Sequence, residues 1–289
     1  MASRSIAVNF VKMTGAGNDF VLVDNRNAHL FVDWTVFARA ACDRRYGVGA
    51  DGLLVIERSS RADFKMNYYN ADGSYGGMCG NGGRCASRYV MEEENYRSIQ
   101  FEALGYIYRA QEFGGSISLR MKTPNILLAK TKILLFKTKV LFTWIDTGAP
   151  HAVMFLNEVP SGLRRRLLEP DINAIGRRIR LHRRFAPEGT NVDFIELIDE
   201  STISMRTYER GVENETLACG TGAVASAVVS ARRFGLRPPI AVKTRSGEVL
   251  TVFFRLKGER VTGVELTGSA GRVFSGRLKY NASIGRIHA

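Results

Sequence analysis

Two short stretches decide the fold of this 289-residue chain: MCGNGGRCA, residues Met78–Ala86, and ACGTGAVAS, residues Ala218–Ser226. In both, a cysteine is followed by Gly-x-Gly and then by a helical pattern. The second helix, expected over Gly220–Phe234, is apolar nearly all round, which is typical of a buried helix. Gly235 stands just after it, where glycine commonly ends a helix. We therefore expect each half of the chain to present one thiol at the start of a helix.

The two cysteines, Cys79 and Cys219, lie 140 residues apart, about half the chain. This separation indicates a duplicated architecture, and the length corresponds to about two domains at roughly 150 residues each. The pattern around them is rich in strands. Apolar alternation predicts strands over Ile6–Lys12, Phe20–Asp24, Leu53–Glu57, Phe64–Tyr69, Ile117–Met121, Leu141–Ile145, Ala152–Leu156, Val192–Leu197, Ile203–Tyr208, Val249–Arg255, Val261–Leu266 and Arg272–Leu278. Helices are expected over Trp34–Arg45, Gly80–Glu94 and Gly220–Phe234.

Composition limits the class of protein. Hydrophobic residues make up 45% and charged residues 24% of the chain, which excludes a disordered or fibrous protein. No apolar run reaches the roughly 18 residues of a membrane helix, and the first residues lack the apolar core of a secretion signal. We therefore expect a cytoplasmic protein that does not contact a membrane.

The net charge is +13, from 41 Lys and Arg against 28 Asp and Glu. Eight arginines lie between Arg164 and Arg184, and lysines alternate with apolar residues over 130–139, as in a half-buried strand pair. Such a surplus favours nucleic acid or other anionic partners, but no zinc-finger, RNP-like or helix-turn-helix pattern accompanies it. A solvated basic face is the simpler interpretation, so no nucleic-acid partner is expected.

The four cysteines are not spaced for a metal or for a disulfide framework. Cys42, Cys79, Cys85 and Cys219 include no C-x-x-C pair, so no metal site is expected. A helix N-terminus favours the thiolate form of a cysteine. Thiol and thiolate are one group in two protonation states, so a pair of them can remove a hydrogen from one face of a carbon and return a proton to the other. Two matched thiols thus indicate inversion of a stereocentre.

Six blocks, in order along the chain, extend this interpretation. They are FVKMTGAGNDFVLVD (Phe10–Asp24), RRYGVGADGLLVIE (Arg44–Glu57), NADGSYGGMCGNGGRC (Asn70–Cys85), TGAPHAV (Thr147–Val153), PEGTNVDF (Pro187–Phe194) and YERGVENETLACGTGA (Tyr208–Ala223). With these blocks the sequence resembles the diaminopimelate epimerase family. The resemblance implies cofactor-independent epimerisation of LL-2,6-diaminopimelate to meso-diaminopimelate, in the synthesis of lysine and peptidoglycan precursors.

The same resemblance implies an α+β fold of two pseudo-symmetric domains, each a curled, mostly antiparallel sheet around a central helix. Residues 1–123 with 268–289 would form the half that carries Cys79, and residues 124–267 the half that carries Cys219. The last strand would return to pair with the first domain. A homodimer with a small-molecule amino-acid substrate and no cofactor is expected.

The resemblance also assigns roles to single residues. Cys79 and Cys219 would be the base and the acid, and His151 and Glu209 would polarise them. The residues expected to bind substrate are Asn18, Asn70, Gly80, Asn81, Asn191, Glu209, Arg210, Gly220 and Thr221. Two positions depart from the family pattern: Ala149 replaces an asparagine, and Gly52 stands where some members carry a glutamine.

Other functions stay open at this point. A racemase could use the same cysteine pair on another amino acid, such as histidine or proline. From other classes, a thiol redox sensor or a basic nucleic-acid-binding module would also explain parts of the sequence. A pyridoxal enzyme is disfavoured, because no phosphate cradle with a partner lysine is recognisable.

Overall fold

The computed structural model describes residues 5–135, 137–168 and 171–288. The chain divides into two compact units. The N-terminal unit combines the residues up to Leu119 with those from Gly268 onward, and the C-terminal unit is Arg120–Thr267. Each unit is described by itself below.

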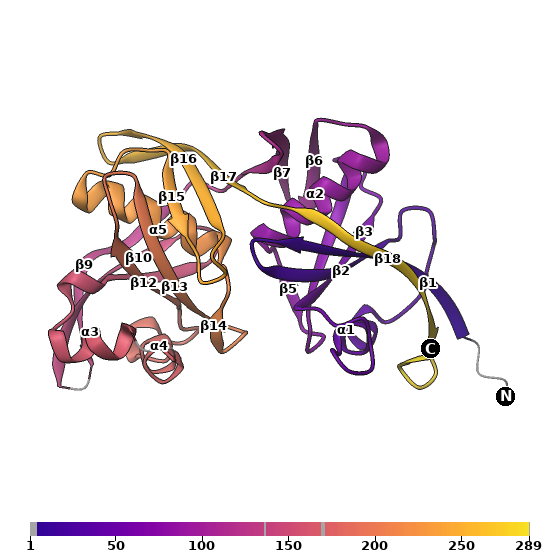
Figure 1. The fold of residues 1–289 in the computed structure, drawn as a ribbon, viewed down its shortest axis with the longest axis horizontal. Coiled ribbons are helices and arrows are strands. Elements are labelled where there is room, and N and C mark those ends of the chain that lie inside the picture. Colours follow the sequence, from indigo (N-terminus) through magenta and orange to yellow (C-terminus); the bar gives the residue numbers. More distant parts are fainter. Residues whose placement is uncertain (1–4, 136, 169–170, 289) are drawn as a thin grey trace. The chain divides into compact units, whose positions relative to one another are not determined.

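The N-terminal unit is a sheet with two helices (Figure 1). Its strands are β1 (Ser5–Gly15), β2 (Asn18–Asp24), β3 (Gly52–Glu57), β4 (Phe64–Asn70), β5 (Tyr75–Gly77), β6 (Ser98–Ala103), β7 (Tyr106–Phe113), β8 (Ser116–Arg120), β18 (Gly271–Asn281) and β19 (Arg286–His288), and its helices are α1 (Trp34–Cys42) and α2 (Gly80–Glu94). Strand β18 pairs antiparallel with β1, and β1 pairs antiparallel with β2. Strand β3 is parallel to β2, β4 is antiparallel to β3, and β6 is parallel to β4. Strand β7 is antiparallel to β6, β8 is antiparallel to β7, and the short β5 is antiparallel to β4.

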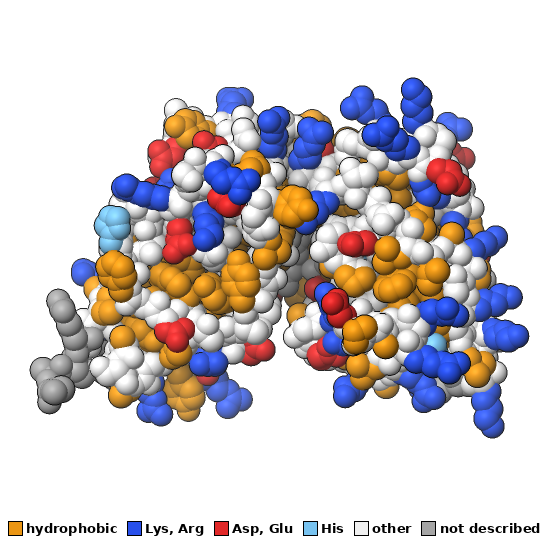
Figure 2. Space-filling view, turned by 180° about the vertical axis from the view of Figure 1, so that it is seen from behind, with side chains coloured by type: hydrophobic (Ala, Val, Ile, Leu, Met, Phe, Trp, Pro, Cys, Tyr) orange, Lys and Arg blue, Asp and Glu red, His pale blue; other side chains and the backbone are white. Residues whose placement is uncertain are grey.

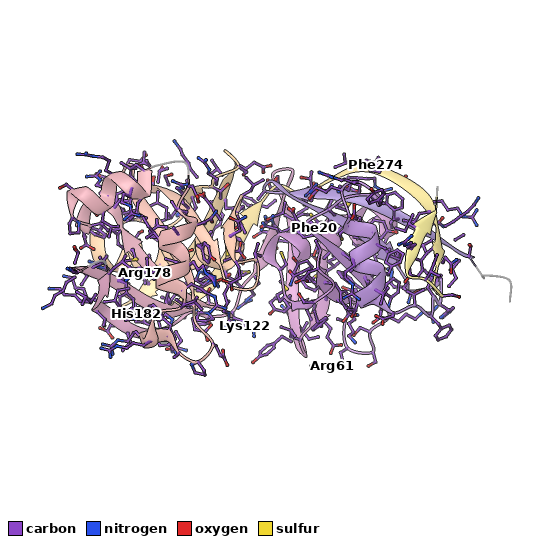
Figure 3. All side chains as sticks on the ribbon, turned by 90° about the horizontal axis from the view of Figure 1, so that it is seen from below. Phe20, Arg61, Lys122, Arg178, His182 and Phe274 are labelled. Atoms are coloured by element: carbon purple, nitrogen blue, oxygen red, sulfur yellow. The ribbon has the colours of Figure 1, made fainter. Side chains whose placement is uncertain are left out.

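This sheet curls around α2. The helix contacts β1 and β18 near one end of the strand order and β6 and β7 near the other end. A flat sheet could not bring both sets of strands to one helix. Strand β18, drawn in yellow in Figure 1, runs antiparallel along nearly all of β1, which confirms the predicted return of Arg272–Leu278 to the first half of the chain. Phe274 of β18, labelled in Figure 3, packs edge to face against Phe10 of β1, with the ring centroids 5.9 Å apart.

The C-terminal unit repeats the same plan. Its strands are β9 (Asn125–Leu135), β10 (Thr138–Asp146), β11 (Pro150–Phe155), β12 (Asn191–Leu197), β13 (Thr202–Glu209), β14 (Asn214–Thr216), β15 (Ile240–Lys243), β16 (Val249–Lys257) and β17 (Arg260–Gly268), and its helices are α3 (Ser161–Leu168), α4 (Asn173–Arg180) and α5 (Gly220–Phe234). Short 3-10 turns lie at Leu156–Glu158 and Arg183–Phe185.

Strand pairing shows the duplication directly. Along the order β10, β11, β12, β13, β15, β16 and β17, successive neighbours pair antiparallel, parallel, antiparallel, parallel, antiparallel and antiparallel. The short strand β14 pairs antiparallel with β13. This is the series found from β1 to β8, in which short β5 occupies the place of β14. Helix α5 contacts strands from β10 to β16, as α2 does in its own unit. The expected α+β fold, with a curled and mostly antiparallel sheet around one helix in each half, is confirmed.

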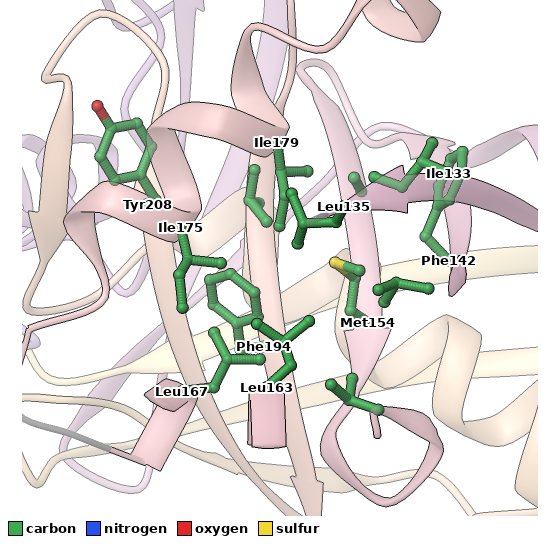
Figure 4. Close-up of a cluster of buried hydrophobic side chains, with 14 of the residues drawn as sticks. Ile133, Leu135, Phe142, Met154, Leu163, Leu167, Ile175, Ile179, Phe194 and Tyr208 are labelled. Carbon is green, nitrogen blue, oxygen red and sulfur yellow. The ribbon is translucent and has the colours of Figure 1, made fainter. Parts of the chain in front are cut away.

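A cluster of buried apolar side chains packs helices α3 and α4 onto the C-terminal sheet (Figure 4). Leu163 and Leu167 from α3, and Ile175 and Ile179 from α4, point into it at i, i+4 spacing. The arginines of these helices lie on the other side, and Arg165, Arg166, Arg177 and Arg178 are exposed. Figure 2 shows Lys and Arg side chains spread over the visible face with acidic side chains among them. These arginines therefore form an exposed basic face on α3 and α4.

Some predicted boundaries were wrong. The helix expected over Trp34–Arg45 ends at Cys42, because the Asp43 carboxylate accepts hydrogen bonds from the backbone N–H groups of Arg45 and Tyr46 and closes a turn instead. The strand pair expected over 130–139 is confirmed as the end of β9 and the start of β10, with Phe136 outside the described residues. Strands β5, β6, β7, β14, β15 and β19 and helices α3 and α4 are additional to those predicted.

Adjacent leucines of β9 test the outer core. Leu135 is 1% exposed and Leu134 60% exposed, so they point to opposite faces of the strand. We expect Leu135→Ala to lower the free energy of unfolding of the C-terminal unit by about 2–5 kcal/mol and Leu134→Ala to change it by less than about 0.5 kcal/mol. Urea unfolding monitored by Trp144 fluorescence in a Trp34→Phe background measures both, and equal losses would contradict the assigned faces.

Candidate active site

Cys79 and Cys219 occupy equivalent positions in the two units. Each is the residue before the first turn of the central helix, with extended backbone angles of φ −113°, ψ 123° and φ −121°, ψ 113°. Each sulfur accepts a hydrogen bond from the backbone N–H three residues on, from Gly82 at 3.3 Å and from Gly222 at 3.4 Å. Both thiols therefore sit in the positive field of a helix N-terminus.

Glycine is required beside each of these sulfurs for reasons of space. A Cβ at Gly222 would lie 2.7 Å from Oδ1 of Asp193 and 3.3 Å from Sγ of Cys219. A Cβ at Gly82 would lie 2.9 Å from a methyl carbon of Leu54. The second glycine of each Cys-Gly-x-Gly thus allows the helix to begin directly against the sheet.

In the N-terminal unit, Asn81 and Asn18 are brought together. Asn81 donates from Nδ2 to Oδ1 of Asn18 at 2.6 Å, and its own Oδ1 accepts from the completely buried Arg84 at 2.8 Å. Asn18 donates onward to Asp51 at 2.9 Å. This chain of bonds fixes both amides at the start of α2.

Behind Asn18 lies a cluster of charges. Arg44 donates two hydrogen bonds to Asp19 and one to Asp51, and Lys12 pairs with Asp19 at 2.7 Å. Burial opposes the charge on Asp19, but Arg44 and Lys12 outweigh it and lower its pKa to about 2. The Asp19 carboxylate therefore stays ionised at neutral pH.

Asn70, expected to bind substrate, is placed at the end of β4 in a turn. Its Nδ2 donates to Oγ of Ser74 at 2.9 Å, and the backbone of the same two residues is also hydrogen-bonded. Gly52 begins β3 opposite Asn70, and a Cβ there would lie 2.5 Å from the ring of Tyr68. The Tyr68 ring therefore occupies the space that a side chain at position 52 would need.

In the C-terminal unit, Cys219 is 5% exposed and contacts the side chains of Thr221 and Glu209. Its Sγ is 3.4 Å from the Thr221 hydroxyl. Burial and the negative charges of Glu209 and Asp193 raise the pKa of Cys219 well above its usual value, against the hydrogen bonds from Thr221 and Gly222. Cys219 is therefore a neutral thiol at neutral pH.

Glu209 stands at the end of β13 beside this thiol. Thr216 donates a hydrogen bond to its Oε1, and a hydrogen bond with Cys219 favours its ionised form. Burial is the larger effect and raises the pKa of Glu209, with a further upward contribution from Asp193.

His151 is completely buried at the centre of the same half-site. Its Nδ1 lies 2.8 Å from Oδ2 of Asp193, and its Nε2 lies 2.9 Å from Oγ1 of Thr221 and 3.3 Å from Nδ2 of Asn191. The sequence analysis missed Asp193, although it lies two residues after Asn191 on one strand and so shares its face. That spacing was the available signal.

Arg210 is anchored by its backbone rather than by its side chain. Its N–H donates to Oδ1 of Asn191 at 2.8 Å. Its guanidinium, 30% exposed, reaches Glu188, which is 79% exposed, at 3.3 Å. Exposed ion pairs of this kind are weak, so this guanidinium can exchange its partner for another carboxylate.

The predicted site residues thus form two sets, one in each unit. Cys79, Gly80, Asn81 and Asn18 lie together in the N-terminal unit, with Asn70 in a separate turn. The C-terminal set comprises Cys219, Gly220, Thr221, His151, Asn191, Glu209 and Arg210, joined by the contacts above.

The two remaining cysteines lie in the protein core. Cys42 and Cys85 are buried, and burial raises the pKa of Cys42 to about 12. Within residues 5–135, 137–168 and 171–288, no three His, Cys, Asp or Glu side chains are grouped so as to hold a metal ion. None of the helices in the described part of the chain has the length and apolar character needed to cross a membrane.

Comparison with known sequences identifies relatives over almost the whole chain. The sequence model of the family "Diaminopimelate epimerase" matches residues 10–111 and 143–272. Diaminopimelate epimerase of Aquifex aeolicus is 41% identical over 285 residues, covering 94% of this chain and 98% of the relative. The enzyme of the same name from Chlorobaculum tepidum is 40% identical, covering 92% and 99%.

Solved structures with the same fold are more distant in sequence. A hydroxyproline epimerase from Agrobacterium vitis, with bound trans-4-hydroxy-L-proline, aligns with a TM-score of 0.68 at 15% identity, covering 96% of this chain and 94% of that one. A phenazine biosynthesis protein of the PhzF family from Bacillus anthracis aligns with a TM-score of 0.69 at 17% identity, covering 94% and 99%. These likenesses establish the fold.

The charge beside Cys219 can be tested by removing it. We expect Glu209→Gln to lower the pKa of the Cys219 thiol, because a neighbouring carboxylate disfavours the thiolate. The midpoint pH for alkylation of Cys219 by iodoacetamide, followed by peptide mass spectrometry, should fall by about 1–2 units. Glu196→Gln, at an exposed position of β12, is the matched control. An unchanged midpoint in Glu209→Gln would contradict the assigned contact.

Proposed function

This chain belongs to the diaminopimelate epimerase family, and on that basis we propose that it interconverts LL-2,6-diaminopimelate and meso-2,6-diaminopimelate with Cys79 and Cys219 as its acid–base pair. The observation that carries the residue assignment is the matched capping of α2 and α5 by these two sulfurs. The enzyme is an amino-acid epimerase of the kind that works without pyridoxal phosphate.

The reaction requires both thiols to reach one carbon. In one direction the thiolate of Cys79 takes the α-hydrogen as a proton, and the C–H electron pair remains on the carbon. The thiol of Cys219 then gives its proton to the opposite face, which inverts the centre and leaves Cys219 as the thiolate. The reverse direction exchanges the two roles. The raised pKa of Cys219 supports its role as the proton donor in the first direction.

Developing negative charge on the substrate needs stabilisation that water cannot give in a closed site. Backbone N–H groups at the two helix starts, at Gly80–Asn81 and Gly220–Thr221, are suited to bind a carboxylate. Both segments lie next to the sulfurs, so a carboxylate held there would place its α-carbon near the thiols. His151 and Glu209 then accompany Cys219 as groups that adjust its protonation.

The far end of the substrate calls for separate contacts. Diaminopimelate carries a second amino-acid group, which differs from the side chains of proline or histidine. The amides of Asn18, Asn70 and Asn191 and the guanidinium of Arg210 are the proposed contacts for it. Arg210 supports this role because its guanidinium is paired with the exposed carboxylate of Glu188. A homodimer in the cytoplasm is part of the same proposal and rests on the family resemblance.

Deuterium uptake tests the reaction itself. We expect LL-diaminopimelate incubated with the enzyme in deuterated water to give meso product with deuterium at the inverted α-carbon, because the donating thiol exchanges its proton with solvent. Proline and histidine, offered in parallel, should not be racemised. Product without deuterium would rule out the two-base reaction, and racemisation of proline or histidine in place of diaminopimelate would overturn the substrate assignment.

Removal of either thiol tests the residues. We expect Cys79→Ala and Cys219→Ala each to lower kcat by at least about 10²–10⁴-fold, the contribution of a positioned acid or base. Circular dichroism should remain that of the unchanged protein. Cys42→Ala is the control, since Cys42 is the last residue of α1 and is buried in the core, and this variant should keep its activity. Full activity in either of the first two variants would remove that cysteine from the mechanism.

A further inference from the structure

Asp193 carries a buried carboxylate in the middle of the C-terminal half-site. It lies on β12 between β11 and β13 and is completely buried. Oδ2 lies 2.8 Å from Nδ1 of His151, and Oδ1 accepts from the Thr207 hydroxyl at 2.8 Å. A buried charge is costly unless its oxygens are hydrogen-bonded, and here the two neighbouring strands supply one partner each. Gly222 leaves the space for it at the start of α5.

The proton position on His151 follows from an adjacent amide. The backbone N–H of Arg210 can only donate, so the Asn191 side-chain atom 2.8 Å away must be the oxygen. The nitrogen of that amide then faces Nε2 of His151 at 3.3 Å. Because an amide NH₂ is also only a donor, Nε2 must accept, and it carries no hydrogen.

With Nε2 unprotonated, the neutral ring holds its hydrogen on Nδ1. That nitrogen faces the Asp193 carboxylate, which only accepts when ionised. Both ends of the ring therefore require the same tautomer. A hydrogen on Nε2 would instead point at the NH₂ group of Asn191.

Thr221 connects this ring to the sulfur. Its one hydroxyl hydrogen can point to Nε2 of His151, 2.9 Å away, or to Sγ of Cys219, 3.4 Å away. When Cys219 is a thiol, its S–H is donated to Glu209 and the Thr221 hydroxyl donates to Nε2. After the sulfur gives up its proton, the hydroxyl turns to the thiolate and the Asn191 amide continues to donate to Nε2. The network gains and loses no proton in this exchange.

We propose that Asp193 is a positioning residue for the epimerisation: by holding the His151 proton on Nδ1, it keeps Nε2 available to Thr221, whose hydroxyl then turns to Cys219 when the sulfur becomes a thiolate. The effect on the rate rests on the proposed function. The position of the proton on His151 does not, and can be measured on the resting protein.

Nitrogen NMR reads the tautomer directly. In protein labelled with ¹⁵N-histidine, one of four histidines in the chain is His151, and its signals are identified by their loss in His151→Gln. We expect the wild-type ring in the Nδ1–H form. In Asp193→Asn this form should no longer be exclusive, and kcat should fall by between about 10-fold and 10⁴-fold, with KM changed by less than about twofold. Glu196→Gln, exposed on the same strand, should keep both the spectrum and kcat.

Each other result overturns the proposal. A wild-type ring in the Nε2–H form would contradict the network without any variant, which covers the case in which Asp193→Asn does not fold. An Asp193→Asn protein that keeps the wild-type tautomer would remove the proposed role, whatever its kcat. A wild-type enzyme with the Nδ1–H ring but no epimerase activity would instead reject the proposed function and leave the network intact.

Discussion

The capping of one helix by one cysteine is the constraint on which each half of this protein depends. In each unit a sulfur accepts the N–H of the residue three positions on, at 3.3 or 3.4 Å, and the helix that follows fills the inside of a curled sheet. Capping satisfies a backbone donor that would otherwise be buried without a partner. The same contact holds the thiol where the helix field acts on it, so fold and chemistry share one interaction.

The groups around Cys219 counteract the field of the helix N-terminus, which favours a thiolate. The helix N-terminus and the hydrogen bonds from Thr221 and Gly222 favour a thiolate, whereas burial and the carboxylates of Glu209 and Asp193 favour the thiol, and the latter prevail. An acid that must also serve as a base needs this opposition, because either influence alone would fix one protonation state.

The sequence predicted the parts of the fold that have a local cause. The helices after Cys79 and Cys219 were predicted to their last residue, because Gly-x-Gly starts and the αL residues that end them are local signals. Helices α3 and α4 were missed, since their arginines dominate the pattern and each contributes only two buried apolar side chains, four residues apart. Asp193 was missed for another reason: its role depends on His151, from a different strand, and pairing of β11 with β12 is not visible in the sequence.

The central proposal is that two sulfhydryls, one from each unit, act on a single carbon of the substrate. Oxidation tests it most directly, because two sulfurs that can flank one carbon can also approach closely enough to bond. The protein would be treated with a mild thiol oxidant in the absence of substrate, and its peptides mapped by mass spectrometry without reduction. The account predicts a disulfide between Cys79 and Cys219, with loss of activity that a reductant restores. Recovery of both cysteines unlinked after such treatment, in an otherwise active preparation, would contradict it.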